Sequence, residues 1–212
     1  MTCKICSKET EKLFDKLVLG KYSITYFQCA SCDFIQTEEP FWLQEAYSNA
    51  ITATDVGLIS RNILYSELIP PILELFSKEP SDSFLDFGGG YGMFVRIMRD
   101  KGYEFFLEDR YAENLFAKYF ELKNYNGSRF KALTSFEVFE HLENPLEEIS
   151  EMFKLSDNII FSTELQPYPF ETVLDWWYLA PEHGQHIAFY SMKTLRKISE
   201  LFDFVWLVLI LL

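Results

Sequence analysis

The chain has 212 residues, of which 49% are hydrophobic and 17% aromatic, and its formal net charge is −13. This length suffices for one αβ domain with a hydrophobic core and a small additional unit, and the aromatic content excludes a disordered chain. The acid excess repels polyanions, and no run of Lys or Arg offers a basic patch, so the composition disfavours nucleic acid as a partner.

The first residues, MTCKICSKETEK, lack the apolar stretch of a secretory signal. The longest apolar stretch, 204–212, is shorter than the roughly 20 residues of a membrane-spanning helix, and we expect it to form a strand. We therefore expect a cytoplasmic protein with no membrane partner. The oligomeric state is left open.

Two C-x2-C pairs open the chain, Cys3 with Cys6 and Cys29 with Cys32. In a reducing compartment, four cysteines in this arrangement predict the four thiolates of a closed, structural zinc site, with a redox or chance pairing as the alternative. The aromatic and β-branched stretch 21–28 between the pairs predicts a strand. Residues 1–36 are thus expected to form a zinc-ribbon-like unit.

Residues 37–80 predict a helical connector. Apolar residues recur there at helical spacing, and Pro70-Pro71 is expected to end that helix and start a second one. We also expect Tyr47 in this connector to reach the cofactor or the substrate.

Residues 81–212 predict a second domain in which strands and helices alternate. The expected strands are 83–87, 104–108, 130–136 and 158–163, and the expected helices are 93–101, 112–120, 144–155 and 192–201. This alternation predicts an α/β fold, with a Rossmann-like, mostly parallel sheet and helices on both faces.

A glycine-rich turn follows the first of these strands and reads FLDFGGGYG. Glycines at 88, 90 and 92 let a cofactor approach the backbone closely. The dinucleotide pattern G-x-G-x-x-G fails, because Met93 stands at its third glycine position. A glycine turn without a ligand is the alternative.

The pattern D-x-G-x-G-x-G resembles the class I methyltransferases that use S-adenosylmethionine (SAM). This resemblance implies that Asp86, Gly88, Gly90 and Gly92 bind SAM, and that an acid after the next strand binds the ribose hydroxyls. By register that acid is Asp109, with Glu108 as the second choice. The stretch EVFEHL matches a family motif beside the sulfonium in Glu137, Glu140 and His141, which adds Glu137 to the cofactor site.

An aromatic and polar segment after the last parallel strand is expected to form the acceptor pocket. It contains PEHGQH, so a histidine is the expected base, in the order His183, His186, His141, with Glu182 orienting an imidazole. Purely structural histidines are the alternative. With the cysteine unit, this segment resembles methyltransferases that act on nucleotide-linked sugars and similar small metabolites.

Three other functions remain in view: an RNA-directed methyltransferase, a catalytically inactive SAM-binding protein and a nicotinamide oxidoreductase. The family's sheet closes with an antiparallel hairpin, for which only residues 204–212 are available. The hairpin is therefore expected to be incomplete, and the chain to be truncated, frameshifted or naturally short.

Overall fold

The computed structural model describes residues 1–48, 57–76, 79, 81–168 and 170–204. Its elements are, in chain order, β1 (Glu11–Val18), β2 (Tyr22–Gln28), β3 (Ile35–Thr37), α1 (Leu43–Ala46), α2 (Leu58–Phe76), β4 (Ser83–Phe87), α3 (Met93–Asp100), β5 (Glu104–Glu108), η1 (Leu122–Asn124), β6 (Ala132–Phe136), η2 (Phe139–His141), α4 (Pro145–Leu155), β7 (Ile159–Ser162), η3 (Phe170–Asp175), η4 (Trp177–Leu179), β8 (Ala188–Phe189) and α5 (Met192–Phe202). They form two compact units, each described by itself below.

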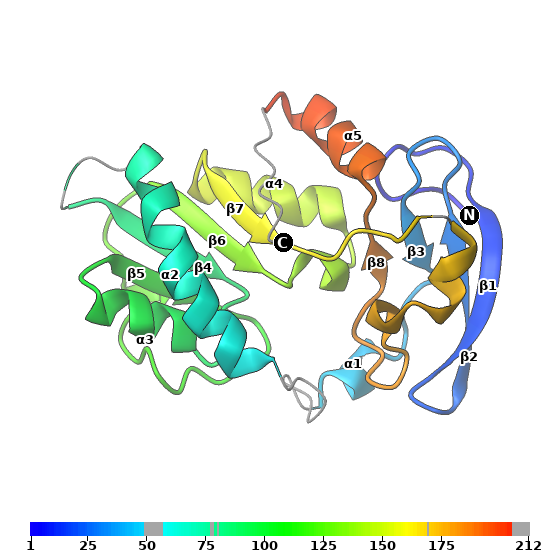
Figure 1. The fold of residues 1–212 in the computed structure, drawn as a ribbon, viewed down its shortest axis with the longest axis horizontal. Helices are drawn as coiled ribbons and strands as arrows, with labels where there is room; N and C mark the ends of the chain where they lie inside the picture. The colour runs from blue at the N-terminus through cyan, green and yellow to red at the C-terminus, as the bar shows by residue number, and fades with distance from the viewer. Residues whose placement is uncertain (49–56, 77–78, 80, 169, 205–212) are drawn as a thin grey trace. The chain divides into compact units, whose positions relative to one another are not determined.

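Unit 1 joins Met1–Trp42 with Glu140–Leu146 and with the described residues from Glu164 onward. Its antiparallel sheet has the strand order β1-β2-β3-β8. The short strand β8 pairs with β3 through Ile35 and Phe189, so a late segment of the chain completes a sheet begun by the first residues (Figure 1). The predicted strand at 21–28 is β2, whereas the sequence reasoning missed β1, β3 and β8.

Unit 2 comprises Leu43–Phe139 and Glu147–Thr163 and contains a parallel sheet of order β5-β4-β6-β7. A parallel bridge between Leu107 and Glu121 extends this order by one residue beyond β5. The four strands are those that the alternating pattern predicted, with slightly shorter bounds for β6 and β7. The predicted Rossmann-like α/β fold is therefore confirmed.

Both faces of the parallel sheet are covered. Successive strand residues point to opposite faces, and both members of the neighbouring pairs Phe84/Leu85 and Ala132/Leu133 are buried. One face packs against Ile69 and Leu73 of α2 and against three residues of α3: Phe94, Val95 and Met98. Helix α4 runs along the opposite side, with Ile149 and Met152 buried (Figure 1).

The predicted helix break at Pro70-Pro71 is wrong. Helix α2 continues through both prolines to Phe76. The buried side chains Ile69 and Leu73 lie on either side of the prolines and belong to one hydrophobic cluster, which holds both halves of the helix on the same core. Tertiary packing thus outweighs the two missing N–H donors.

The predicted helix at 112–120 is also wrong, because this segment is a series of bends and turns. Asn114 Oδ1 accepts the Ala117 N–H at 2.8 Å, and Asp109 Oδ1 accepts the Ala112 N–H at 2.7 Å. These side chains replace the carbonyl partners that a helix would have provided.

The predicted terminal strand 204–212 lies, apart from Phe204, outside the described residues. The sequence-based division into 1–36, 37–80 and 81–212 stays a prediction about domains, whereas compactness groups the end of the chain with its beginning. No helix in the described part of the chain is long and apolar enough to cross a membrane.

Candidate functional site

The glycine turn lies at the carboxyl end of β4 in unit 2. It leads from Asp86 to α3, whose N-cap is Gly92 with φ of 82°. The Gly88 N–H donates to the Glu108 carbonyl at 2.7 Å, which ties the turn to the end of β5. The turn therefore sits where ligands bind in open α/β sheets, at the carboxyl ends of neighbouring parallel strands.

Three glycines of this turn leave no room for a side chain, and a Cβ at Gly92 would lie 2.9 Å from Ala117 Cβ and from Asn114 Oδ1. A Cβ at Gly88, where φ is +72°, would strike Val138 beyond the end of β6. A Cβ at Gly89 would strike the Asp86 carboxylate and Leu107. The sequence reasoning missed the need for glycine at 89, because Gly89 falls on a variable position of the family pattern.

Asp109 holds the glycine turn in place. Its Oδ2 accepts the Gly90 N–H at 2.8 Å, and its Oδ1 accepts the Tyr111 N–H at 2.8 Å and the Ala112 N–H at 2.7 Å. The acid chosen by register thus directly contacts the predicted cofactor turn. Its neighbour Glu108 lines the same region, and burial raises the pKa of that carboxyl.

Asp86 is buried, and its Oδ1 accepts a hydrogen bond from Thr134 Oγ1 at 2.7 Å. Burial raises the pKa of Asp86 to about 7, against the opposing effect of the Thr134 hydrogen bond, and the Asp109 charge raises it further. A buried carboxyl at this position therefore changes its charge near neutral pH.

Glu137 follows β6 and adopts φ of +53°, which is unusual for a residue with a side chain. Its Oε1 accepts a hydrogen bond from Ser162 Oγ at 2.7 Å, at the end of β7. The predicted cofactor residues Asp86, Gly88, Gly90, Gly92, Asp109 and Glu137 all lie at the carboxyl ends of the strands of unit 2.

A hollow of about 200 Å³ lies beside the end of β5 and is lined by Leu107, Glu108, Asp109, Ala112, Asn114, Glu121 and Lys123. Near it, Tyr47 stacks on Tyr111, with ring centroids 4.1 Å apart and planes at 9°. The Tyr111 N–H also donates a hydrogen bond to Asp109, and the contact of Tyr47 with the cofactor or the substrate stays a prediction.

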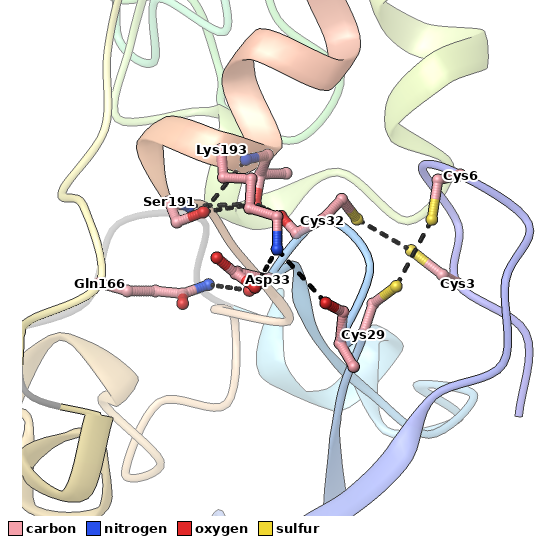
Figure 2. Close-up of polar contacts among 10 residues, drawn as sticks. Cys3, Cys6, Cys29, Cys32, Asp33, Gln166, Ser191 and Lys193 are labelled. Atoms are coloured by element: carbon pink, nitrogen blue, oxygen red, sulfur yellow. Dashed lines mark hydrogen bonds and ion pairs between the residues drawn. The ribbon is translucent and has the colours of Figure 1, made fainter.

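The four cysteines of unit 1 form a cluster with all sulfur atoms within 4.8 Å of one another (Figure 2). Cys3 Sγ lies 3.6 Å from Cys32 Sγ, and Cys6 Sγ lies 3.4 Å from Cys29 Sγ. Zinc–sulfur bonds of about 2.3 Å at tetrahedral angles place sulfur atoms about 3.8 Å apart, so the donor set fits this ion. The hydrogen bond from Cys32 lowers the pKa of the Cys3 thiol to about 5.

Residues late in the chain hold the second cysteine pair. Thr194 Oγ1 donates to the Cys32 carbonyl at 2.8 Å, and Lys193 Nζ lies 3.0 Å from Asp33 Oδ1. Gln166 Nε2 donates to the Asp33 carbonyl at 2.9 Å (Figure 2). The sequence contains no local signal for these contacts, which join residues more than a hundred positions apart.

The three histidines of the chain gather in unit 1. The ring centroids of His141 and His186 lie 4.8 Å apart, and those of His183 and His186 lie 4.7 Å apart. Burial lowers the pKa of His141 to about 4, and burial likewise lowers the pKa of His186 well below its ordinary value. These two rings are therefore neutral at pH 7.

The acid beside the histidines is Glu140, which is fully buried and accepts the Tyr178 hydroxyl at 2.5 Å. Burial, and after it the charge of Glu182, raises the pKa of Tyr26, and the role of Glu182 in orienting an imidazole stays a prediction. Glu140 matched the motif in the sequence together with its chain neighbour His141, but its position beside His186 could not be foreseen from that match.

Known methyltransferases resemble this chain in sequence profile and in fold. The profile of the family described as "Methyltransferase domain" matches residues 61–208. The fold is similar to the plantazolicin methyltransferase BpumL solved with SAH and a monoazolic desmethylPZN analog (14% identity, 76% of this chain and 68% of that chain covered, TM-score 0.51). The complex of BpumL with a triazolic analog and SAH gives 12% identity, coverage of 76% and 69%, and a TM-score of 0.50.

An O-methyltransferase family protein from Burkholderia thailandensis is also similar, at 10% identity, coverage of 76% and 57%, and a TM-score of 0.41. A search of curated proteins found no match. Because the methyltransferase profile matches well over half of the chain, the chain belongs to this family. It is a SAM-dependent methyltransferase.

Proposed function

We propose that this methyltransferase transfers the methyl group of SAM to a small molecule, with nucleotide-linked sugars as the first class of acceptor to test. One observation carries the cofactor assignment: the Asp109 carboxylate binds the Gly90 N–H of the glycine turn. A cofactor that contains a nucleoside needs a glycine-rich turn that it can approach closely and an acid at the end of the neighbouring strand to bind its ribose. We also propose that the protein acts in the cytoplasm.

The residues proposed to hold SAM are those at the strand ends of unit 2: Asp86, Gly88, Gly90, Gly92, Asp109 and Glu137. The Asp109 carboxylate would accept hydrogen bonds from the ribose hydroxyls of SAM, and the backbone of the glycine turn would allow the cofactor to approach closely. When bound, SAM supplies an activated methyl group together with its leaving group. The protein's own task is then to align the acceptor and to exclude water.

The acceptor's proton is assigned to a histidine nitrogen. An oxygen or carbon acceptor must lose a proton as it gains the methyl group, and imidazole is suited to take that proton near neutral pH. His183 is the first candidate, followed by His186 and His141, and Glu182 is proposed to orient an imidazole. The net charge of −13 and the aromatic residues around PEHGQH favour a compact, uncharged or weakly charged reacting group over a polyanion.

The four cysteines are proposed to hold one structural zinc ion. Four thiolates close the coordination sphere and leave no open position for substrate. The zinc therefore stabilises unit 1 and takes no part in methyl transfer.

Calorimetric titration with S-adenosylhomocysteine tests the cofactor assignment, with Asp109→Ala as the site variant and Glu113→Ala as the control on an exposed acid of the same loop. We expect saturable binding by the wild type and by Glu113→Ala, and loss of binding in Asp109→Ala. Equal binding by all three would overturn the assignment of Asp109, and Glu108→Ala would be the next variant.

Transfer of labelled methyl groups from SAM to a panel of sugar nucleotides tests the acceptor class. Transfer to one of them would support the proposal. Transfer to RNA with strong salt dependence would overturn it in favour of the RNA-directed alternative. SAH binding without transfer to any acceptor class would indicate a SAM-binding protein without activity.

A further inference from the structure

Three side chains of unit 1 converge on one point. Glu140 and His141 end the short helix η2, and His186 precedes β8. The Ile187 N–H donates to the Glu140 carbonyl at 2.8 Å, which joins these two segments. One donor atom from each of the three side chains lies within 4.8 Å of the others, and Glu140 Oε1 lies 3.9 Å from His141 Nε2.

Each of these three side chains is oriented by a hydrogen bond to a group outside the cluster. His141 Nδ1 lies 3.1 Å from the Gln185 carbonyl, and His186 Nδ1 lies 2.6 Å from the Tyr178 carbonyl. A carbonyl oxygen only accepts, so both rings carry their proton on Nδ1 and their lone pair on Nε2. The Tyr178 hydroxyl donates to Glu140 Oε1 and orients the carboxylate in the same way.

This pattern separates the cluster from an ordinary buried polar network. Metal-binding histidines characteristically donate their other ring N–H to a carbonyl or carboxylate, and metal-binding carboxylates are themselves hydrogen-bonded. Here both imidazoles and the carboxylate have such outer partners, and Tyr178 supplies two of them, through its carbonyl and its hydroxyl.

We propose that Glu140, His141 and His186 bind one divalent first-row transition-metal ion through two Nε2 atoms and one carboxylate oxygen. Two imidazoles and one carboxylate favour Mn²⁺, Fe²⁺, Co²⁺ or Zn²⁺ over Mg²⁺ and Ca²⁺, which prefer an all-oxygen shell. Three protein ligands leave open coordination positions, in contrast to the closed set of four thiolates. The site does not depend on the proposed methyl acceptor.

Titration with Co²⁺ of the purified full-length protein carrying one equivalent of zinc, which fills the four-thiolate site, tests this site, because Co²⁺ bound to thiolates and Co²⁺ bound to nitrogen and oxygen have different absorption spectra. We expect one equivalent of Co²⁺ to bind with the visible bands of nitrogen and oxygen ligands and without thiolate charge transfer. Absence of such a species would overturn the proposal.

The site variant is Glu140→Gln, which keeps the side-chain volume and an oxygen to accept the Tyr178 hydroxyl. The matched control is Glu143→Gln, the same change three residues further on, where the backbone carbonyl accepts a hydrogen bond from Lys4. We expect the Co²⁺ affinity to fall at least tenfold in Glu140→Gln and to stay unchanged in Glu143→Gln. Equal affinities in two variants that melt like the wild type would contradict the site.

A measurement on the wild type decides the matter even if Glu140→Gln fails to fold. The chain contains three histidines, so selective ¹⁵N labelling of histidine introduces few signals. Pulsed electron paramagnetic resonance of the bound Mn²⁺ or Cu²⁺ form should detect hyperfine coupling to two imidazole nitrogens. Coupling to one imidazole or to none would overturn the proposed ligand set.

Discussion

Thr134 Oγ1 donates a hydrogen bond of 2.7 Å to the buried carboxylate of Asp86, linking β6 to the penultimate residue of β4. This contact joins the two central strands of unit 2 immediately below the glycine turn. It sets an electrostatic balance, because burial favours the protonated form of Asp86 and the Thr134 hydroxyl favours the ionised form.

The pH dependence of stability follows from that balance. The pKa of Asp86 is about 7 in the folded protein and close to 3.8 in the unfolded chain. Between these values the folded state holds the extra proton, so the free energy of unfolding falls as pH rises from about 4 to about 7. Asp86→Asn keeps the shape and stays neutral, so we expect its stability, relative to the wild type, to increase over this window. Urea unfolding at pH 4.5 and 7.5 measures both proteins, and a difference that does not change with pH would contradict the prediction.

Gly89→Ala should destabilise unit 2 and weaken cofactor binding. The added methyl group meets the Asp86 carboxylate and Leu107, and we expect a loss of about 1–3 kcal/mol in the free energy of unfolding. Gly20→Ala is the comparison, because its Cβ would meet nothing within 4 Å and only the strain of its positive φ would be felt. Denaturant unfolding and SAH titration of both variants check this prediction. A wild-type SAH affinity in Gly89→Ala would contradict a close approach of the cofactor to the backbone of the glycine turn.

The zinc ion proposed for the cysteine cluster should be released faster when the hydrogen bond from α5 to the Cys32 carbonyl is removed. Thr194→Val deletes the hydroxyl that donates to the Cys32 carbonyl and that also forms part of the capping box of α5. We therefore expect the free energy of unfolding to fall by about 1–2 kcal/mol. Transfer of zinc to a chromogenic chelator measures the release rate. Ser199→Ala, which removes a hydroxyl bonded to the Arg196 carbonyl within α5, should release zinc like the wild type.

His183→Asn tests the proposed base with little change to the fold. The Asn carbonyl can accept the Gln185 N–H that His183 Nδ1 accepts at 3.1 Å, whereas the basic imidazole ring is lost. We expect kcat for methyl transfer to fall by about 10²–10⁴, with SAH affinity unchanged. A fall of only a few-fold would exclude His183 as the base.

The parts of unit 2 that depend on local pattern could be predicted from the sequence. The strands of the parallel sheet are apolar runs bounded by turn-forming residues, and the glycines of the turn have a fixed spacing. Both features can therefore be located from the sequence alone. Segments governed by side-chain contacts were missed. Residues 112–120 were predicted as a helix because their apolar spacing says nothing about Asn114 and Asp109 binding the backbone.

The cluster around Glu140 could be predicted only in part. Its histidines were conspicuous in a chain that has three, and Glu140 stood in a recognisable motif. The carbonyls of Gln185 and Tyr178, which orient the two rings, are backbone groups and leave no trace in the choice of amino acid. The strand β8 could not be predicted either, because a strand of two residues is too short to show an alternating pattern.

The contacts of the first residues of unit 1 with β8 and α5 determine the order in which the two units can fold during synthesis. Lys193 and Asp33, which form an ion pair, are 160 residues apart, so unit 1 closes only after α5 has left the ribosome. Unit 2 is drawn mainly from one continuous stretch and can assemble earlier. During synthesis the two cysteine pairs therefore lack their contacts with α5 while the parallel sheet that bears the glycine turn can already form.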